Sequence, residues 1–303
     1  MPRPAENRLS IRVYAKINLS LRILGRIEGG YHSIETIFQN ISIFDRLSVK
    51  PSAGEVRVTC SDPSIPEGPE NLAWRAATNC LEMLGVRDGG VEIHIEKGIP
   101  AGAGLGGGSA DAAGTILACE RLYGSLPGGD TTRYALAASL GADVPFLLSG
   151  GRALAWGIGE RMLHLPVSST TPLLLAMPSF SISTSWAYRA LDVSQAEGQS
   201  TETMDINGGP LKWMELTGPF GPVASLVNDF EPVVFAHHPE LRDLKHSLIE
   251  AGARVSLLSG SGSGIYGLFE DEATRDRAIS TLEDMEDLKL IPAAFIDTAC
   301  VFE

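Results

Sequence analysis

A glycine-rich segment, PAGAGLGGGSADAAG at residues 100–114, contains the residue types that point most directly to chemistry. It places six glycines in the fourteen residues after Pro100, whereas 33 glycines in 303 residues would give about one or two. An alternating stretch precedes the segment and an alanine-rich stretch follows it, as in a loop between a strand and a helix. Such a loop exposes consecutive backbone N–H groups, and the helix N-terminus adds about half a positive charge. These features predict a phosphate-binding site.

Three familiar phosphate-binding patterns fit the segment poorly. The P-loop pattern GxxxxGK[ST] is absent because no lysine follows the glycines, and Ser109 is followed by Ala110. The protein kinase signatures HRD and DFG are missing. The dinucleotide pattern GxGxxG begins at Gly102 but also at Gly262, and no acidic residue ends a second strand about twenty residues on. An oxidoreductase is therefore disfavoured, and the bracketing strand and helix disfavour a flexible linker.

Composition indicates an ordinary globular protein. The chain has 303 residues, 44% hydrophobic and 20% charged, a length that favours two domains over one. The N-terminus lacks the apolar stretch of a signal peptide, and no uncharged run of 18 apolar residues could span a membrane. The net charge of -13 disfavours nucleic-acid binding, which depends on clustered lysine and arginine. We therefore expect a cytoplasmic protein that binds neither nucleic acid nor membrane.

Cysteine and histidine spacing predicts no metal site. The four cysteines include no CxxC pair, so we expect buried free thiols in place of a zinc ribbon or a disulfide framework. The histidines His237, His238 and His246 lack the HExxH spacing of a zinc site. Any metal ion would therefore have to come with a ligand.

The elements that must position the glycine segment begin with two strands. Residues 11–23 alternate apolar and polar side chains, which predicts a strand with a bend or bulge and places Lys16 and Asn18 on one face. Residues 25–30 predict a turn, and residues 33–44 predict the next strand or pair of strands.

A helix and a strand then lead to the glycine segment. Residues 71–84 have apolar side chains at helical spacing with Asn71 as the N-cap, and residues 91–97 alternate as a strand. The helix after the loop begins near Ser109 and carries Asp111, whose charge suits the positive end of the helix dipole.

The rest of the chain alternates strands and helices. Its last hundred residues contain, in order, a helix, a hairpin, a helix and a strand, at residues 239–252, 254–270, 272–285 and 293–297. That order is typical of an α+β split-βαβ arrangement. We predict two domains, residues 1–160 and residues 161–303.

Several segments resemble the motifs of the GHMP small-molecule kinases. The glycine segment is similar to their second motif, AKINLSL at residues 15–21 to the first, and LLSGSGSGIYGLF at residues 257–269 to the third. YHSIETIF and GADVP resemble the corresponding segments in one branch of this family. The enzymes of that branch phosphorylate the 2-hydroxyl of a methylerythritol joined to cytidine diphosphate, in the non-mevalonate isoprenoid pathway. The resemblance runs in order from Ala15 to Phe269. The middle segment, residues 193–220, is longer than in the shorter members of the family, and it has no assignable role.

The resemblance implies a two-domain α+β fold with the active site in the cleft between the domains. The N-terminal domain would be ribosomal-S5-like and bind ATP, and the C-terminal domain would be ferredoxin-like. Asp143 in GADVP would be the general base and Lys16 its partner, because an ammonium group keeps a nearby carboxylate ionised and offsets charge on the transferred group. Magnesium would arrive with ATP, held mainly by the phosphates. We expect a monomer or homodimer whose partners are two small molecules, ATP and the cytidine diphosphate-linked polyol.

The resemblance also assigns binding residues. The predicted ATP-binding residues are Pro100, Gly102, Gly104, Leu105, Gly106, Gly107, Gly108 and Ser109, with Asn71 and Lys97 for the adenine. The predicted substrate-binding residues are Asn18, Tyr31, His32, Phe38, Thr184, Tyr188, Gly260 and Ser261. Tyr31 and Tyr188 would sandwich the cytosine ring, and His32 would pair with its edge.

Two other functions stay open at this point. One is another GHMP kinase, of the mevalonate or homoserine type, and the other is a nucleotide-binding relative without catalytic activity. YHSIETIF favours the cytidyl substrate, and the presence of both Lys16 and Asp143 favours catalysis. Taken alone, an aspartate before Val-Pro is typical of a turn cap, and a lysine on a polar strand face is usually solvated.

Overall fold

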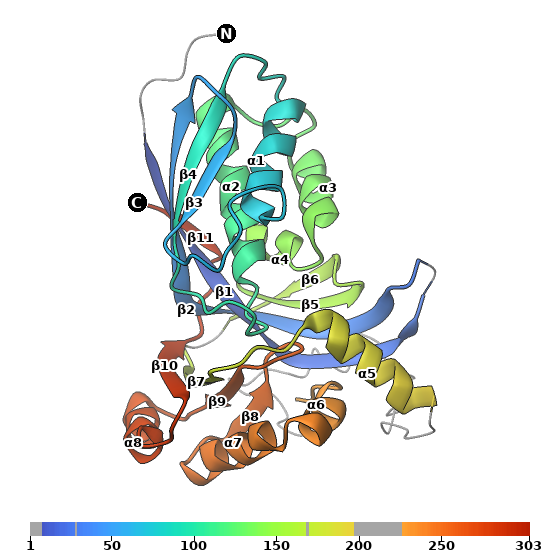
Figure 1. Cartoon of the computed structure of the whole chain (residues 1–303), viewed down its shortest axis with the longest axis vertical. Helices are drawn as coiled ribbons and strands as arrows, with labels where there is room; N and C mark the ends of the chain where they lie inside the picture. Colours follow the sequence, from blue (N-terminus) through green and yellow to red (C-terminus); the bar gives the residue numbers. More distant parts are fainter. Residues whose placement is uncertain (1–7, 28, 168–169, 197–225) are drawn as a thin grey trace.

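The computed structural model describes residues 8–27, 29–167, 170–196 and 226–303 (Figure 1). Within these residues the chain forms two β-sheets and the helices that cover them, and one hydrophobic core includes side chains from both sheets. No helix in this part of the chain is long and apolar enough to cross a membrane. Of the middle segment at residues 193–220, only the first four residues are described.

The larger sheet has seven strands and includes the first and last strands of the described chain. Its path is β11-β1-β2-β4-β3, and β5 pairs with both β2 and β6. The strands are β1 (Leu9–Arg26), β2 (His32–Ser52), β3 (Arg57–Cys60), β4 (Gly90–Glu96), β5 (Arg152–Gly157), β6 (Arg161–Leu165) and β11 (Cys300–Phe302). All neighbouring pairs are antiparallel except β3 with β4.

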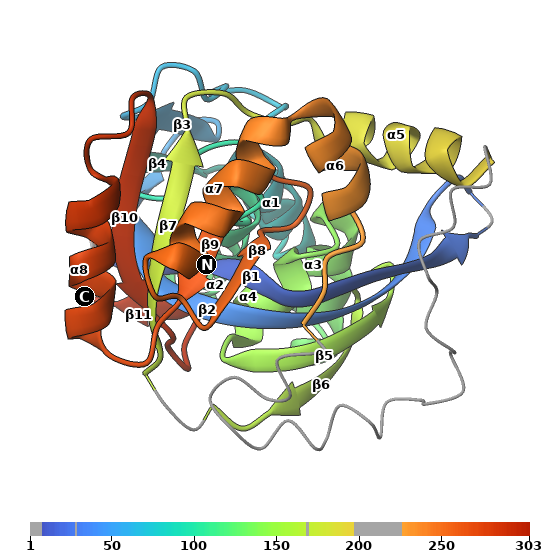
Figure 2. The same ribbon diagram turned by 90° about the horizontal axis from the view of Figure 1, so that it is seen from below.

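β1 and β2 form a long hairpin that reaches toward helix α5, as Figure 2 shows. The predicted first strand is confirmed, and three register shifts along its pairing with β2 supply the expected bulges. The middle of β1 is buried on both faces, so Lys16 and Asn18 are only 4% and 3% exposed. The polar face of this strand therefore lies inside the protein.

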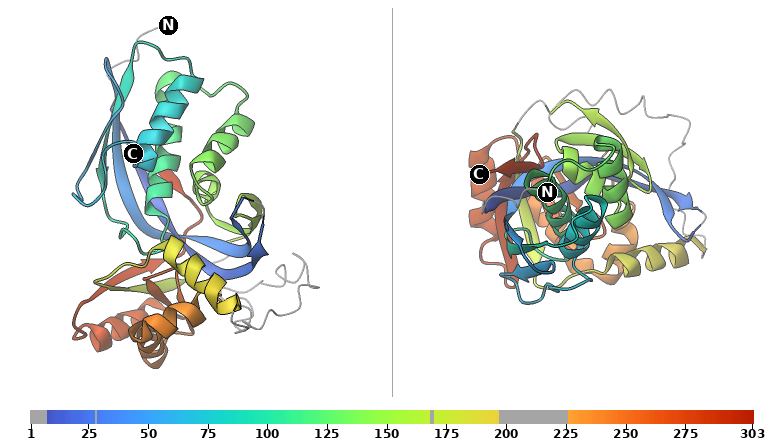
Figure 3. Two further views of the ribbon diagram at one scale, coloured as in Figure 1. Left: turned by 45° about the vertical axis from the view of Figure 1, so that its right-hand side comes forward. Right: turned by 90° about the horizontal axis from the view of Figure 1, so that it is seen from above.

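Four helices lie on one side of the larger sheet, and their side chains contribute to its core (Figure 3). They are α1 (Leu72–Met83), α2 (Gly107–Tyr123), α3 (Asp130–Leu140) and α4 (Val144–Ser149). Asn71 caps α1 as predicted, because its side-chain oxygen accepts a hydrogen bond from the N–H of Ala73 at 2.8 Å. The predicted order of strand, glycine loop and helix is confirmed by β4, residues 97–106 and α2.

The smaller sheet has four strands in the order β10-β7-β9-β8, all antiparallel. Its strands are β7 (Pro172–Pro178), β8 (Val255–Leu258), β9 (Ile265–Leu268) and β10 (Leu288–Ala294). Its helices are α5 (Thr184–Ala196), α6 (Glu231–His237), α7 (Pro239–Glu250) and α8 (Glu272–Leu282). This topology confirms the predicted split-βαβ arrangement.

The central strand β7 shows why the two sheets pack together. Leu173 and Leu175 belong to the core shared with the larger sheet, whereas Leu174 and Ala176 belong to a second core under the helices. Alternate side chains of a strand point to opposite faces, so both faces of the smaller sheet are buried. A strand buried on both faces is apolar throughout, as the sequence PLLLAMP is.

The structure corrects the predicted end of the chain. The strand expected at residues 293–297 ends at Ala294, because Phe295 then forms a bridge with Ile41 of β2 in the other sheet. The sequence analysis missed β11, which pairs with β1.

A division at residue 160 would separate β5 from β6, which pair with each other, so the change of sheet comes after Leu165.

Candidate active site

The glycine loop forms one wall of a pocket of about 240 Å³. Nine of the ten predicted ATP-binding residues line it, and they are Pro100, Gly102, Gly104, Leu105, Gly106, Gly107, Gly108, Asn71 and Lys97. The pocket opens at the N-terminus of α2, where unpaired backbone N–H groups and the helix dipole favour an anion. The position of these residues fits the predicted phosphate site.

Ser109 is the tenth predicted residue and lies on the other side of the loop. A Cβ atom added to Gly141 would be 3.9 Å from the Ser109 hydroxyl oxygen. Gly141 is the first residue of the GADVP segment, which contains Asp143. The Ser109 hydroxyl therefore lies close to the segment that carries the predicted base.

Two glycines of the loop are required by their surroundings. Gly104 has φ of 74°, and a Cβ there would overlap the backbone carbonyl oxygen of Ser259 in the third glycine-rich motif. Gly106 has φ of 73°, and a Cβ there would be 3.0 Å from Cγ of Lys16. Both positions combine a left-handed backbone with close packing, which only glycine tolerates without strain.

Lys16 and Asp143 form an ion pair next to the glycine loop. The Lys16 ammonium nitrogen Nζ is 3.2 Å from Asp143 Oδ2, and the backbone N–H of Lys16 donates to the carbonyl of Leu105 in the loop. The Lys16 side chain is 5% exposed and that of Asp143 is 31% exposed. The lysine is therefore enclosed, while its carboxylate partner can be reached by a bound molecule.

Asp143 precedes helix α4 but does not cap it with its side chain. It occupies the N-cap position with Pro145 in the first turn, and its carboxylate accepts no capping hydrogen bond. The turn-cap role that is typical of an aspartate before Val-Pro is thus not the one seen here. The carboxylate pairs with Lys16 instead.

A group of buried polar side chains surrounds the Lys16 ammonium. Lys16 donates to Asn18 Oδ1 at 2.8 Å, and the Asn18 amide donates to the Thr36 hydroxyl at 2.8 Å. The ammonium also lies 5.3 Å from the centre of the Phe38 ring, which stacks on Phe146. Tyr266 from the smaller sheet donates to the backbone carbonyl of Asn18. Phe38 is 1% exposed and so lies beneath the lysine in the core.

The third glycine-rich motif packs against the second. The Ser259 hydroxyl donates to the carbonyl of Gly104 at 3.2 Å. Ser261 is hydrogen-bonded to Thr184 at 2.9 Å, and a Cβ at Gly260 would be 3.5 Å from Asn18 Oδ1. The predicted residues Asn18, Thr184, Gly260 and Ser261 are thus brought together where the two sheets meet.

Of the residues predicted for cytosine, His32 and Tyr188 meet but Tyr31 does not join them. The His32 and Tyr188 rings are stacked with centroids 4.6 Å apart and planes 21° apart. Burial, with a smaller contribution from Asp143, raises the pKa of Tyr188 to about 12. Tyr31 is 62% exposed in the turn between β1 and β2. The proposed sandwich of the base between Tyr31 and Tyr188 is therefore not preformed.

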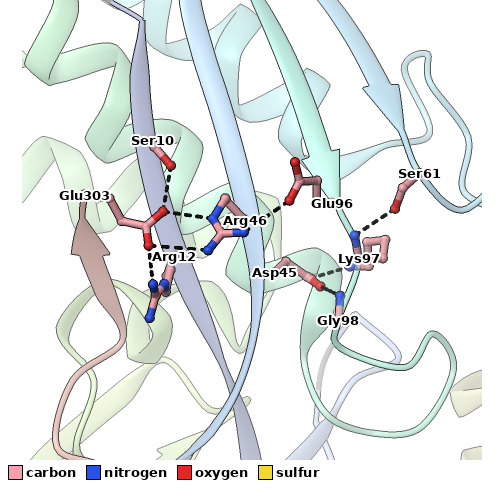
Figure 4. Close-up of polar contacts among 9 residues, drawn as sticks. All are labelled: Ser10, Arg12, Asp45, Arg46, Ser61, Glu96, Lys97, Gly98 and Glu303. Carbon is pink, nitrogen blue, oxygen red and sulfur yellow. Dashed lines mark hydrogen bonds and ion pairs between the residues drawn. The ribbon is translucent and has the colours of Figure 1, made fainter.

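The side chains of Lys97 and Asn71 are already engaged by the protein. Lys97 Nζ is 2.5 Å from Asp45 Oδ2, a contact drawn in Figure 4, and 3.0 Å from Asp111 Oδ2. Asn71 caps α1 and donates to the carbonyl of Pro66. Both residues form walls of the pocket, and their contact with adenine stays a prediction.

Burial dominates the electrostatics of the Lys97 cluster. Removal from water, only partly offset by Lys97, raises the pKa of Asp111 to about 8. Burial acts to lower the pKa of Lys97, but the two carboxylates outweigh it and the pKa is raised. Asp111 therefore lies on the buried side of α2 and pairs with Lys97, and the expected role at the positive end of the helix dipole is wrong.

Sequence reasoning missed two carboxylates around the site, Asp45 and Asp192, and did not predict the partner of a third, Asp111. Asp45 is an acidic residue between Ile43 and Leu47 on the buried face of β2, which is a signal of a buried partner, but nothing local identifies Lys97 as that partner. Asp192 is four residues after Tyr188 on α5, a spacing that places both on one helix face. Asp111 was recognised only for its position in the helix. No group of three or more metal-ligating side chains occurs in the part of the chain described.

The comparisons with known proteins agree with this geometry. The sequence matches the GHMP kinases N terminal domain at residues 71–151 and the GHMP kinases C terminal domain at residues 215–287. A homoserine kinase from Cytophaga hutchinsonii has a TM-score of 0.73 over 100% of this chain and 99% of its own, at 18% identity, which is a likeness of fold. The chain belongs to the GHMP kinases, and the predicted two-domain α+β fold of that family is confirmed.

More similar relatives define the branch within that family. A 4-diphosphocytidyl-2-C-methyl-D-erythritol kinase from Prosthecochloris aestuarii is 39% identical over 95% of this chain and 98% of its own length. One from Moorella thermoacetica is 39% identical over 91% and 95%. A crystal structure of 4-(cytidine 5'-diphospho)-2C-methyl-D-erythritol kinase, 35% identical, has a TM-score of 0.75 over 94% of this chain and 98% of that one. Within the GHMP kinases, the chain belongs with these enzymes, as the resemblance indicated.

Proposed function

We propose that this chain transfers the γ-phosphoryl group of ATP to the 2-hydroxyl of 4-diphosphocytidyl-2-C-methyl-D-erythritol, with Asp143 as the general base. The observation that carries this proposal is the Lys16–Asp143 pair, with 3.2 Å between Nζ and Oδ2, directly beside the glycine loop. The reaction is a step of the non-mevalonate isoprenoid pathway. It needs a fixed γ-phosphate, neutralised charge and a hydroxyl that can lose its proton.

Each side chain in the pair has a separate task. Asp143 is the exposed member, so its carboxylate accepts the proton of the acceptor hydroxyl as that oxygen attacks the γ-phosphorus. Lys16 is held by Asn18 and by the glycine loop, so its ammonium stays beside the reacting oxygens and offsets their negative charge. Because both groups are fixed before substrate arrives, little reorganisation is needed during the reaction.

The glycine loop binds the triphosphate in this proposal. Backbone N–H groups between Gly104 and Gly108, together with the N-terminus of α2, contact the phosphate oxygens. Magnesium enters as part of the Mg²⁺–ATP substrate and is held mainly by those oxygens. The Ser109 hydroxyl, which lies 3.9 Å from a Cβ added at Gly141 in the segment of Asp143, contacts the γ-phosphate or its metal ion in this proposal.

The acceptor binds on the opposite side of the ion pair. His32 and Tyr188 contact the cytosine base, while Asn18 and Thr184 contact the polyol. Tyr31 closes over the base from the hairpin turn. Both substrates are small molecules, in keeping with the cytoplasmic location and the monomeric or dimeric state that we expect.

A coupled assay of ADP release with Mg²⁺–ATP tests the proposal. The wild type is compared on 4-diphosphocytidyl-2-C-methyl-D-erythritol, mevalonate and homoserine, and we expect turnover only on the first. In the Asp143→Asn variant we expect kcat to fall roughly 10²–10⁴-fold with ATP binding retained. Asp243→Asn makes the same chemical change at a position 74% exposed on α7 and should leave kcat unchanged.

The other outcomes identify the alternatives. Turnover on mevalonate or homoserine in preference to the cytidyl substrate would contradict the proposed acceptor. Binding of ATP without turnover on any of the three would support a nucleotide-binding protein without catalytic activity.

A further inference from the structure

Helix α5 holds the His32 ring through two side chains. Tyr188 stacks on the face of the imidazole, and Asp192 Oδ1 lies 2.8 Å from its Nε2 atom. Tyr188 and Asp192 are four residues apart on one helix, so they project from the same face. Phe230 packs edge-to-face on Tyr188, with centroids 4.9 Å apart, and supports it from the other side. The plane and the rotation of the His32 ring are therefore both fixed.

The same carboxylate also holds the end of the β1–β2 hairpin. Arg26 is the cross-strand neighbour of His32, and its guanidinium is 3.2 Å from Asp192 Oδ2. Each oxygen of Asp192 thus has its own partner, Oδ1 with the imidazole and Oδ2 with the guanidinium.

The hydrogen bond to Asp192 determines which ring nitrogen carries the proton. An ionised carboxylate has no hydrogen to donate, so Nε2 must be the donor. A neutral histidine with a proton on Nε2 has a lone pair on Nδ1. The remaining ring nitrogen is therefore a hydrogen-bond acceptor for whatever molecule binds there.

We propose that Asp192 is a positioning residue that keeps His32 as the Nε2–H tautomer, so that Nδ1 selects a pyrimidine carrying an amino group at position 4. This inference rests on the proposed function, in which His32 meets the edge of the substrate's base. A base whose edge meets Nδ1 lies roughly in the plane of the imidazole and hence parallel to the Tyr188 ring, whose plane is 21° away.

The discrimination is between cytosine and uracil. The 4-amino group of cytosine donates a hydrogen bond to Nδ1. The 4-oxo group of uracil has only lone pairs, so it cannot donate to Nδ1 and the two acceptors repel each other. A buried polar group left without its partner disfavours the wrong ligand much more than a missing contact on the surface does. We expect cytidine 5'-diphosphate to bind roughly 30-fold or more tightly than uridine 5'-diphosphate.

Two measurements on wild type and Asp192→Asn test the inference. The first is the binding ratio of cytidine and uridine 5'-diphosphate, with the nucleotide pocket filled by a non-hydrolysable ATP analogue. The asparagine can accept from Nε2 or donate to it, so it no longer fixes the tautomer, and we expect the ratio to fall roughly tenfold. The second is ¹⁵N NMR of His32, which distinguishes the two tautomers and the imidazolium directly. Asp243→Asn serves as the control and should leave both readouts unchanged.

Each result has a definite meaning. An Nε2–H ring in the wild type, with a ratio that falls in Asp192→Asn, supports the inference. An Nδ1–H ring or an imidazolium, or a binding ratio that Asp192→Asn leaves unchanged, overturns it, even where wild-type turnover upholds the proposed function. Should the wild type fail to phosphorylate 4-diphosphocytidyl-2-C-methyl-D-erythritol, the proposed function fails, while the two readouts still decide the role of Asp192.

Discussion

Two lysine–carboxylate groups lie on either side of the glycine loop, and they differ in one respect that decides their roles. Gly106 packs against the stem of Lys16, and the next residue, Gly107, packs against Lys97, where an added Cβ would be 3.3 Å from the ammonium nitrogen. Lys16 pairs with Asp143, and Lys97 pairs with Asp45 and Asp111. The Asp143 side chain is 31% exposed, whereas those of the other two carboxylates are 0% and 4% exposed.

The two groups also differ in what else their carboxylates contact, and we propose that only the Lys16–Asp143 pair takes part in chemistry. Asp45 uses its second oxygen to accept hydrogen bonds from the N–H groups of Gly98 and Ile99, where the glycine loop begins. The Lys97 cluster thereby fixes the start of the loop. The Lys16–Asp143 pair instead presents a carboxylate to the space that a bound molecule would occupy.

After Asp143→Asn, the largest expected effect comes from Lys16→Met, which removes the cation from the exposed pair. We expect kcat to fall roughly 10²–10³-fold, because charge on the transferred group loses its fixed counter-ion. The free energy of unfolding should change by only about 1 kcal/mol, since the methionine keeps the apolar stem in place. Steady-state kinetics and urea unfolding measure the two quantities. Lys50→Met, at a side chain 54% exposed, is the control, and near wild-type turnover in Lys16→Met would contradict the assigned role.

Asp45→Asn breaks the buried cluster and should act on stability. Removing one charge from a buried group leaves the others without compensation and destabilises a protein by about 3 kcal/mol. We expect that loss in urea unfolding, with kcat of the folded enzyme at low temperature within about threefold of wild type. A large drop in kcat without loss of stability would show that the Lys97 cluster takes part in the reaction.

Gly104→Ala tests the contact between the two glycine-rich motifs. The new methyl group would overlap the carbonyl oxygen of Ser259, in addition to the strain of a left-handed alanine. Gly85→Ala is a matched control, because Gly85 has φ of 68° with nothing within 4 Å of an added Cβ. We expect the control to cost about 1 kcal/mol of unfolding free energy and Gly104→Ala about 1–3 kcal/mol more. Equal costs would show that the contact contributes little.

The last expected effect is a change in the pH dependence of stability on Asp111→Asn. Burial raises the pKa of Asp111 to about 8 in the folded protein, whereas an unfolded aspartate has a pKa of about 3.9. Between those values the unfolded state binds fewer protons, so the contribution of Asp111 to stability is present at low pH and is lost as pH rises toward 8. Relative to wild type, Asp111→Asn should therefore gain stability as pH increases. Urea unfolding between pH 5 and about 8 measures this, and parallel curves for the two proteins would contradict it.

Local patterns in the sequence were sufficient to predict most of the fold. The strand, glycine loop and helix around residues 91–123 follow from periodicity and glycine chemistry, and the Asn71 cap follows from residue type. β11 has only three residues and its pairing with β1 joins the two ends of the chain, so no local signal indicates it. The end of β10 was likewise set by contacts with β2 that local patterns do not contain.

For the site, the sequence predicted the residue types but not their partners. The pairing of Lys16 with Asp143 came from a family resemblance, because the two residues are far apart in the chain. The burial of Lys97 depends on Asp45, which is 52 positions away on a neighbouring strand. The contact of His32 with Asp192 spans 160 positions and two elements. Such pairs are set by the packing of the two sheets.

Single-turnover phosphoryl transfer in Asp143→Asn tests the central claim most directly. Enzyme in excess is mixed with bound Mg²⁺–ATP and 4-diphosphocytidyl-2-C-methyl-D-erythritol, and the phosphorylated product is followed by rapid quench, so that binding and product release do not contribute. We predict a rate at least about 100-fold below wild type, with both substrates still bound. A wild-type rate in this variant would contradict the assignment of Asp143 as the base and with it the division between the two lysine–carboxylate groups.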